Sequence, residues 1–172
     1  GRRVGRAIAL ELAAAGDDVA VHFLRSRRDA QDVVAEIQAL GRKAVAVQGD
    51  LARAENAAGV IAETDEKLGG LNVLVNSAAV FHADGSDSLP RFDTDLWRRT
   101  FEVNVLAPAA LCHAAHPHLR AAGRGCIVNL CDIAAQRPWA DHLAYCASKA
   151  ALANLTRSLA RDLSRGAGGV DV

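Results

Sequence analysis

The pattern of apolar and polar positions alternates along the chain between helical spacing and short buried runs. Helical spacing predicts helices over residues 4–15, 28–40, 55–68, 93–119 and 143–164. Runs of β-branched or continuous apolar residues predict strands over residues 19–23, 44–48, 71–75, 126–130 and 170–172, with a glycine turn at 166–169. Pro108 and Pro117 should bend or interrupt the helix over 93–119, because proline lacks the N–H that a helix interior uses.

Helices and strands follow one another in strict alternation, with short connections between them. This order favours one α/β domain over residues 1–172, in which a parallel sheet is covered by helices on both faces. Ligands of such folds bind at the carboxyl ends of the strands. The residues that directly follow each strand are therefore the candidates for chemistry.

Composition narrows the classes of function. Twenty Lys and Arg residues balance twenty Asp and Glu residues, which gives no electrostatic reason to expect nucleic acid or an anionic membrane as a partner. The four cysteines form no C-x-x-C pair, and Pro117 interrupts the cluster of His113, His116 and His118. We therefore expect no metal site, and reduced thiols in a cytoplasmic protein.

The first strand is followed by His22, Arg25 and Ser26. A dinucleotide site needs a group here to bind the adenosine ribose, and an acidic residue would select a free 2′-hydroxyl. A cation with a hydroxyl instead suits a 2′-phosphate, which favours NADPH as the cofactor. The alternative is a solvated arginine next to a serine that caps the following helix.

The next two strand ends offer further candidates. Asp50 and Leu51 follow the second strand, where the carboxylate would lie beside an adenine or would only cap the following helix. Asn76 and Ala78 follow the third strand, where small residues let the backbone approach a cofactor closely. Phe81 could stack on a flat substrate ring, or pack as an ordinary loop aromatic.

The strongest candidate pair is Tyr145 with Lys149. Their spacing of four places both side chains on one helix face, and Tyr145 is the chain's single tyrosine. A nearby ammonium should lower the pKa of the phenol toward neutrality, so that Tyr145 can donate a proton as hydride arrives. Lys149 can also hold the nicotinamide ribose. Asp132, thirteen residues earlier (145 − 132), and Asn104, midway along the preceding long helix, can reach the same cleft.

These motifs, in this order and spacing, resemble those of the short-chain dehydrogenase/reductase family. The matching pieces are Gly5, Asp50-Leu51, Asn76-Ser77-Ala78, Asn104, Asn129 to Asp132, and Tyr145-x-x-x-Lys149. The resemblance implies a Rossmann-like, doubly wound fold with strand order 3-2-1-4-5-6-7 and a small-molecule substrate. It also implies a catalytic Asn, Ser, Tyr and Lys set, and usually a homotetramer.

The chain departs from the family pattern at several positions. Asp132 stands where the family has a catalytic serine, and Arg3 replaces the middle glycine of the glycine motif. Ala79 ends the Asn-Asn-Ala-Gly stretch, and Phe81 follows it. With the His22 to Ser26 segment, these departures resemble pteridine reductases and dihydromonapterin reductases, which implies reduction of a pterin or dihydropterin ring by NADPH.

The same resemblance implies roles for individual side chains. Phe81 and the nicotinamide would sandwich the pterin ring, while Arg3 would contact both cofactor phosphate and substrate. Asp132 would orient Tyr145 or support its proton transfer. Val4 and Gly5 open a helix whose dipole and free N–H groups favour phosphate.

Two other functions stay open. The first is an NADPH-dependent carbonyl reductase of the same family, acting on a 3-oxoacyl thioester or a small ketone. The second is a non-catalytic NADP-binding module. Retention of Asn104, Tyr145 and Lys149 argues against the module, and Asp132 and Phe81 weigh against the carbonyl reductase.

The resemblance also bears on the extent of the protein and on its assembly. The family has a strand before the first residue of this chain and a substrate-covering segment after Val172. We therefore expect a longer natural protein, and a 172-residue chain that folds poorly alone. The apolar outer faces of the helix after Asp93 and of the helix with Tyr145 would pair across a dimer axis, or would only pack on the sheet.

Overall fold

The computed structural model describes residues 3–82, 87–163 and 170–172. Its helices are α1 (Arg3–Ala14), α2 (Arg27–Ala39), α3 (Asn56–Leu68), α4 (Thr94–Phe101), α5 (Ala107–Ala121) and α6 (Leu143–Leu163). Its strands are β1 (Val19–Phe23), β2 (Ala44–Gln48), β3 (Val73–Asn76), β4 (Gly125–Asn129) and β5 (Val170–Asp171). Each predicted element is present, while the expected turn at 166–169 lies outside the described residues.

All strand pairs are parallel, as the alternation of helices and strands predicts. β1 pairs with β2 in the register Val19↔Ala44, and β4 lies between β3 and β5 in a second sheet. Within the described ranges, no strand pairing joins β1 to β3. The observed orders fit the strand sequence that the family resemblance implies, and poor folding of the isolated chain stays a prediction.

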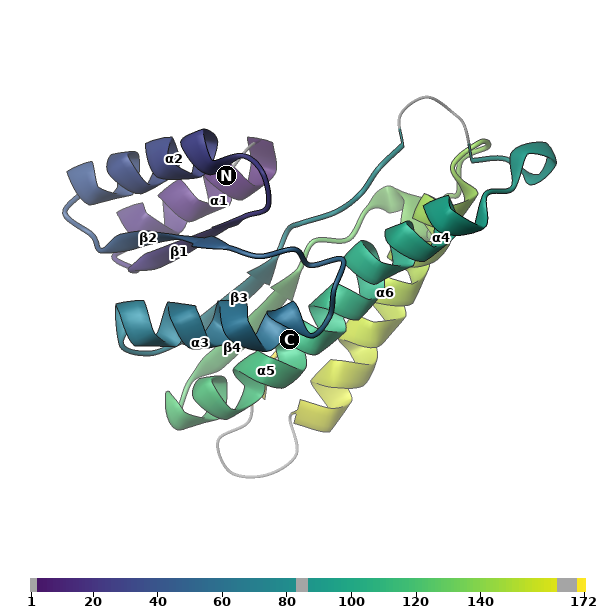
Figure 1. Ribbon diagram of the computed structural model, residues 1–172. Coiled ribbons are helices and arrows are strands. Elements are labelled where there is room, and N and C mark those ends of the chain that lie inside the picture. The colour runs from purple at the N-terminus through teal and green to yellow at the C-terminus, as the bar shows by residue number, and fades with distance from the viewer. Residues whose placement is uncertain (1–2, 83–86, 164–169) are drawn as a thin grey trace.

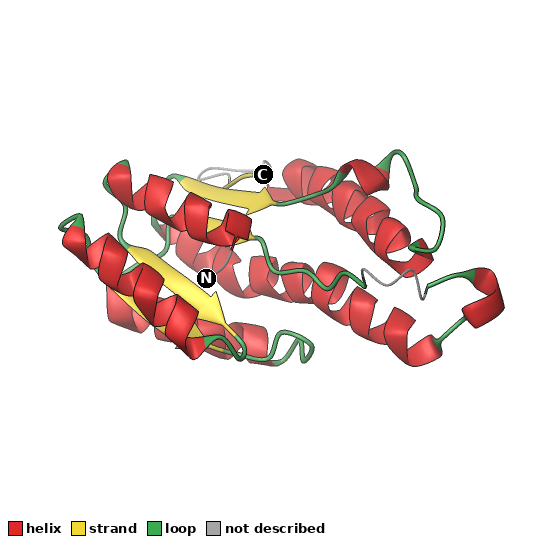
Figure 2. Ribbon diagram, turned by 90° about the horizontal axis from the view of Figure 1, so that it is seen from above, coloured by secondary structure: helices red, strands yellow, loops and turns green. Residues whose placement is uncertain are grey.

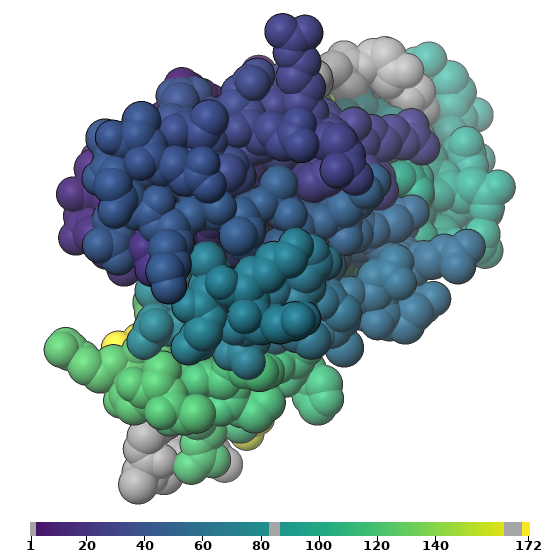
Figure 3. Space-filling view, turned by 60° about the vertical axis from the view of Figure 1, so that its left-hand side comes forward, coloured from purple at the N-terminus to yellow at the C-terminus, as the bar shows by residue number. Residues whose placement is uncertain are grey.

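Helices cover both faces of the sheets (Figures 1 and 2). α1 and α2 pack on one face of β1 and β2, α3 packs on the other, and α5 and α6 lie further along on the side of α3. In the space-filling view, α3 separates the purple and blue N-terminal layer from the green α5 (Figure 3). This arrangement leaves the carboxyl ends of the strands for the site.

Alternation along β1 and β2 divides the apolar side chains between two cores. Val21 and Phe23 face α1 and α2, where they pack with Ile37. Val47 faces the opposite side and belongs to a second cluster with Leu119 and Ile127. Val47, Ile37 and Leu119 are fully buried, so both faces of the sheet layer exclude water.

The long helix predicted over 93–119 is interrupted by a π-helical segment, Glu102–Leu106, between α4 and α5. The wide turn is visible in the backbone bond from the N–H of Ala107 to the carbonyl of Glu102. Pro108 has no N–H for the carbonyl four residues before it, and this missing bond favours such a widening. Pro117 lies inside α5 without ending it. The consequence for the site is that Asn104 lies in the widened turn.

Gly49, directly after β2, has no room for a side chain. A Cβ there would lie 2.6 Å from Cγ2 of the buried Val60, whereas a Cβ on Gly59, in α3, would meet no atom within 4 Å. We expect Gly49→Ala to lower the free energy of unfolding by about 1–3 kcal/mol through overpacking. Gly59→Ala, the matched control, should raise it by about 0.5–1 kcal/mol because alanine favours a helix. Urea unfolding measures both, and a Gly49→Ala protein as stable as the native one would contradict the packing argument.

Candidate active site

Tyr145, the third residue of α6, is hydrogen-bonded to Asp132 at the end of the segment that follows β4. The phenol hydroxyl donates to Oδ2 of Asp132 at 2.9 Å. The other carboxylate oxygen, Oδ1, accepts the backbone N–H of Ala134 at 2.8 Å and so caps the short 3-10 helix Ile133–Ala135. The backbone therefore holds the carboxylate in place while it orients the phenol.

The expectation that an ammonium lowers the pKa of Tyr145 toward neutrality is wrong. Burial raises the pKa of Tyr145, and the hydrogen bond and charge of Asp132 raise it further. Each of these effects favours the neutral phenol, because phenolate would lose solvation and face a carboxylate. Tyr145 is therefore protonated at neutral pH and has a proton to donate, although the raised pKa makes it a weaker acid than a free phenol.

Lys149 lies one turn further along α6 and is 5% exposed. Its ammonium donates to the backbone carbonyl of Leu130 at 2.9 Å, and Nζ lies 5.8 Å from the centre of the Tyr145 ring. Burial lowers the pKa of Lys149, which the charge of Cys131 and of Asp132 partly opposes. The cation is thus held at the carboxyl end of β4, beside the phenol but not bonded to it.

Asn104 joins three segments around this pair. Its Oδ1 accepts the backbone N–H of Val80 at 2.8 Å, and its Nδ2 donates to the carbonyl of Val80 at 3.1 Å and to Oγ of Ser148 at 3.0 Å. Ser148 in turn donates to the carbonyl of Tyr145 at 2.7 Å. The buried amide therefore connects the π-helical turn, the segment after β3 and α6.

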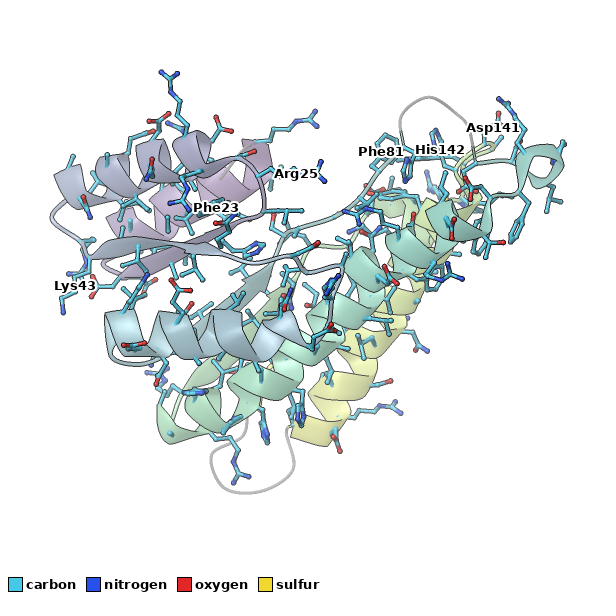
Figure 4. All side chains as sticks on the ribbon, in the orientation of Figure 1. Phe23, Arg25, Lys43, Phe81, Asp141 and His142 are labelled. Carbon is cyan, nitrogen blue, oxygen red and sulfur yellow. The ribbon has the colours of Figure 1, made fainter. Side chains whose placement is uncertain are left out.

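An aromatic cluster surrounds the phenol. The Phe81 ring lies 4.8 Å from that of Tyr145 and 5.0 Å from that of His142, and the Trp139 ring stacks on Tyr145 at 6.3 Å. Figure 4 shows Phe81, Asp141 and His142 together at one end of the molecule. Phe81 is 46% exposed, so one side of the cluster is open to a ligand.

Sequence reasoning missed Trp139 and His142. Both lie in the turn before α6, six and three residues ahead of Tyr145 (145 − 139 and 145 − 142). Phe81 is singled out because the chain has few aromatics, and the same criterion applied to the turn before α6 would have found Trp139.

The amino terminus of α1 lies close to the carboxyl end of β3. A Cβ on Gly5 would lie 3.3 Å from Oγ of Ser77, so this glycine permits the close approach. Arg3 and Val4 are exposed at the start of α1, and Arg3 has a left-handed backbone with φ 50°. That conformation favours glycine, the residue that the family motif has at this position.

Arg25 and Ser26 lie beyond β1, at the start of α2. Arg25 is exposed, on the side of the N-terminal layer toward Phe81 and His142 in Figure 4. Ser26 precedes α2 but makes no side-chain cap hydrogen bond with it. The alternative role of Ser26 as a hydroxyl cap is therefore not seen, and the hydroxyl is available to a ligand.

Other predicted cofactor residues make contacts within the fold. His22 bonds through Nε2 to the carbonyl of Gly49 at 2.9 Å, and burial lowers its pKa, so a neutral ring joins the ends of β1 and β2. Asp50 accepts the backbone N–H of Ala52 at 3.0 Å, in the turn before α3, and so does not cap the following helix as the alternative expected. Leu51 is buried in the core, which leaves only its backbone for a ligand.

Of the two predicted residues after β3, Asn76 makes contacts within the fold, whereas Ala78 is exposed. The Asn76 side chain is buried and donates to Oδ1 of Asn129 at 2.8 Å, and Asn129 donates to Oγ1 of Thr156 at 3.0 Å. This relay of amides joins β3, β4 and α6. Ala78 is exposed just beyond β3.

Among residues 3–82, 87–163 and 170–172, no group of three His, Cys, Asp or Glu side chains could hold a metal ion. No helix in these ranges has the length and apolar character needed to cross a membrane.

Comparison with known proteins gives relatives along the whole chain. Hydroxynaphthalene reductase arp2 of Aspergillus fumigatus is 34% identical over 165 residues, which are 96% of this chain and 59% of that protein. The 3-oxoacyl-[acyl-carrier-protein] reductase FabG of Staphylococcus aureus is 34% identical over 166 residues, 96% of this chain and 66% of that protein. The chain thus spans about three fifths to two thirds of the length of these curated relatives.

Among solved structures, FolM alternative dihydrofolate reductase 1 from Brucella canis, complexed with NADP, superimposes with a TM-score of 0.90 at 31% identity. The match covers 99% of this chain and 67% of that one. The family model for short chain dehydrogenases matches residues 1–172. With the parallel α/β fold and the Tyr145, Lys149 and Asn104 arrangement described above, the chain belongs to the short chain dehydrogenase family.

Proposed function

We propose that the protein is an NADPH-dependent reductase that reduces a pterin or dihydropterin ring, with Tyr145 as the proton donor. The observation that carries this proposal is the hydrogen bond from Tyr145 to Asp132, next to the open face of Phe81. NADPH supplies the hydride when it is bound. The FolM structure complexed with NADP, a similar fold with a dihydrofolate reductase in its name, supports the same substrate class.

The arrangement suits a flat ring with a C=N bond. The ring would stack on Phe81, with Trp139 and His142 at its border, and its nitrogen would face the Tyr145 hydroxyl. With hydride supplied to the carbon by bound NADPH, Tyr145 would give its proton to the nitrogen, and solvent would then return a proton to the phenol. Asp132 keeps the phenol protonated until that transfer, for which the O–H must turn from the carboxylate to the nitrogen.

The cofactor would lie along the carboxyl ends of the strands. The approach of Gly5 to Ser77 brings the N–H groups of α1 to this edge, where they would bind the pyrophosphate beside Arg3 and Val4. Arg25 and the uncapped hydroxyl of Ser26 would bind the 2′-phosphate. Lys149 would hold the nicotinamide ribose from the end of β4.

Reversing the charge at Arg25 tests the choice of cofactor. Arg25→Asp should raise the KM for NADPH about ten- to a hundredfold, because a charge-assisted bond to the 2′-phosphate is lost. The KM for NADH should change far less, since NADH lacks that phosphate. Arg99→Asp, at an exposed arginine of α4, is the matched control and should leave both values near native. Equal changes for both cofactors would remove the role given to Arg25.

A second candidate is a carbonyl reductase. The similarity to FabG and to hydroxynaphthalene reductase favours it, because the names of these relatives describe reductases of a 3-oxoacyl group and of a hydroxynaphthalene, and not of a pterin. Tyr145 could give its proton to a carbonyl oxygen in the same geometry. A non-catalytic NADP-binding module is a further possibility, which the bonded set of Tyr145, Asp132 and Asn104 disfavours.

A substrate panel separates these functions. NADPH oxidation is followed with dihydrobiopterin, dihydromonapterin and a set of ketones, and we expect turnover of a pterin. Phe81→Ala should raise the KM for that pterin about tenfold because stacking is lost. Phe92→Ala, at an exposed aromatic that contacts Trp97 outside the site, is its control. Turnover of ketones alone would establish the carbonyl reductase, and turnover of neither class would favour the binding module.

We also propose the homotetramer that the resemblance implies and the cytoplasmic location that the cysteine pattern suggests. A homotetramer would use the outer faces of α4, α5 and α6, and Leu106, in the π-helical segment between α4 and α5, is more than half exposed. Mass measurement in solution tests the tetramer, and cell fractionation tests the cytoplasmic location.

A further inference from the structure

Asp87 is a buried carboxylate to which the chemistry above gives no role. It is 4% exposed, and its Oδ2 accepts the backbone N–H of Ala144. Its own carbonyl accepts the N–H of Leu143 at 3.3 Å, and a parallel bridge pairs it with His142. Asp87 therefore contacts the start of α6, although it lies 57 residues before Ala144.

The start of a helix needs such a partner. The first N–H groups of an α-helix have no intrahelical acceptor, and a carboxylate at this end is also favoured by the helix dipole. The residue that precedes α6 is His142, which is not among the preferred capping types. Asp87 supplies the missing acceptor from a distant part of the chain, within two residues of Tyr145.

The segments on both sides of the contact between Asp87 and α6 are also held in place. Val80, on the other side of Phe81, is held by Asn104, so both Val80 and Asp87 are anchored to the helices beneath. Asp141, next to the bridge between Asp87 and His142, has a left-handed backbone with φ 59°. A non-glycine residue keeps this conformation where its surroundings hold it, and the bridge is such a restraint.

We propose that Asp87 is a positioning residue, which fixes the first turn of α6 and thereby holds Tyr145 against Asp132 and beside Phe81. The expected effect of Asp87 on kcat rests on the proposed reductase function, whereas its effect on the position of Tyr145 does not. Without the Asp87 carboxylate, the start of α6 shifts and the 2.9 Å bond from Tyr145 to Asp132 lengthens.

Tyrosinate absorbance reports this geometry, because Tyr145 is the only tyrosine among residues 1–172 and the difference from the matching Tyr145→Phe spectrum isolates its signal in a longer protein. The described titratable groups around it are Asp132 and Cys146, whose charges raise its pKa, together with Lys149 and His142. If the phenol moves away from Asp132 and toward solvent, tyrosinate forms at lower pH than in the native protein. A change in stability alone would not shift this titration while the protein stays folded.

The test compares Asp87→Ala with Asp93→Ala. Asp93 caps α4 through the N–H groups of Asp95 and Leu96 at 2.8 and 3.2 Å, so both variants remove a helix cap. We expect Asp87→Ala alone to shift the titration down and to lower kcat about a hundredfold, since small misplacements of reacting groups cost that much. The KM for NADPH should stay near native. Asp87→Asn keeps the acceptor oxygen and should restore both the titration and kcat.

Native titration in a folded Asp87→Ala protein would overturn the proposal, as would an equal shift in Asp93→Ala. If Asp87→Ala does not fold, Asp87→Ser is the second variant, and it should show a smaller shift in the same direction. Failure of both to fold, with native behaviour of Asp87→Asn, would reduce Asp87 to a structural role and overturn the proposal as well. Absence of any turnover in the native protein would contradict the reductase function, while the titration would still decide the role of Asp87.

Discussion

Replacing Tyr145 with phenylalanine is expected to lower kcat/KM for the proposed reduction about a hundred- to ten-thousandfold, the range that general acids contribute. The reason is local, because the hydroxyl bonds to Asp132 while the ring makes the contacts with Phe81 and Trp139. Phenylalanine keeps those ring contacts and loses the hydroxyl, with both its proton and its bond to Asp132. NADPH oxidation with the preferred substrate measures the loss.

Two controls make this result specific. The Tm of Tyr145→Phe should lie close to native, and NADPH should still bind, as seen by a change in cofactor fluorescence. Turnover within a few-fold of native would show that another group donates the proton, and the mechanism assigned to Tyr145 would be wrong. Loss of cofactor binding would instead mean that the hydroxyl mainly serves the cofactor.

The second large effect is expected in the pH dependence of Asp132→Asn. The Asp132 carboxylate raises the pKa of Tyr145 through its hydrogen bond and its charge, so removing the charge lowers that pKa relative to the native protein. Tyrosinate absorbance should then appear at lower pH, and the alkaline loss of kcat/KM should move in the same direction. Burial of the phenol remains, so part of the upward shift remains too.

The raised pKa of Tyr145 also makes the stability of the folded protein depend on pH. The folded protein holds the phenol proton above the ordinary pKa of 10.0, whereas the unfolded chain releases it there. The stability that this preference contributes is complete below that pH and is lost as pH rises toward the folded pKa. In Asp132→Asn the alkaline loss of stability should be smaller.

Asp141→Asn is the matched control for Asp132→Asn. Asp141 is an exposed acid in the same connection between β4 and α6. Asparagine tolerates its left-handed backbone. Its titration and pH profile should match the native ones. An Asp132→Asn protein with the native alkaline profile would show that burial alone keeps the phenol protonated, and that Asp132 only orients it.

The sequence by itself determined the elements and their order. The strands over 19–23 and 44–48 have their predicted bounds, because each is a β-branched run between helices that stop at a glycine. Spacing of four was enough to place Tyr145 and Lys149 on one face of α6, since this geometry depends on helix period alone. Pro108 was enough to predict that the long helix would be interrupted, although not that the interruption would be a π-helical turn.

Only the tertiary structure decided the partners of these side chains. Sequence spacing pairs Tyr145 with the ammonium of Lys149 and predicts a lowered pKa, yet Lys149 donates to Leu130 and the phenol to Asp132. Likewise, nothing local to Asp87 points to α6, because that contact spans 57 residues. Helix period and strand alternation arise from neighbouring residues, whereas burial and hydrogen bonding at the site depend on which distant segments meet there. That meeting of distant segments keeps the single tyrosine protonated and raises its pKa.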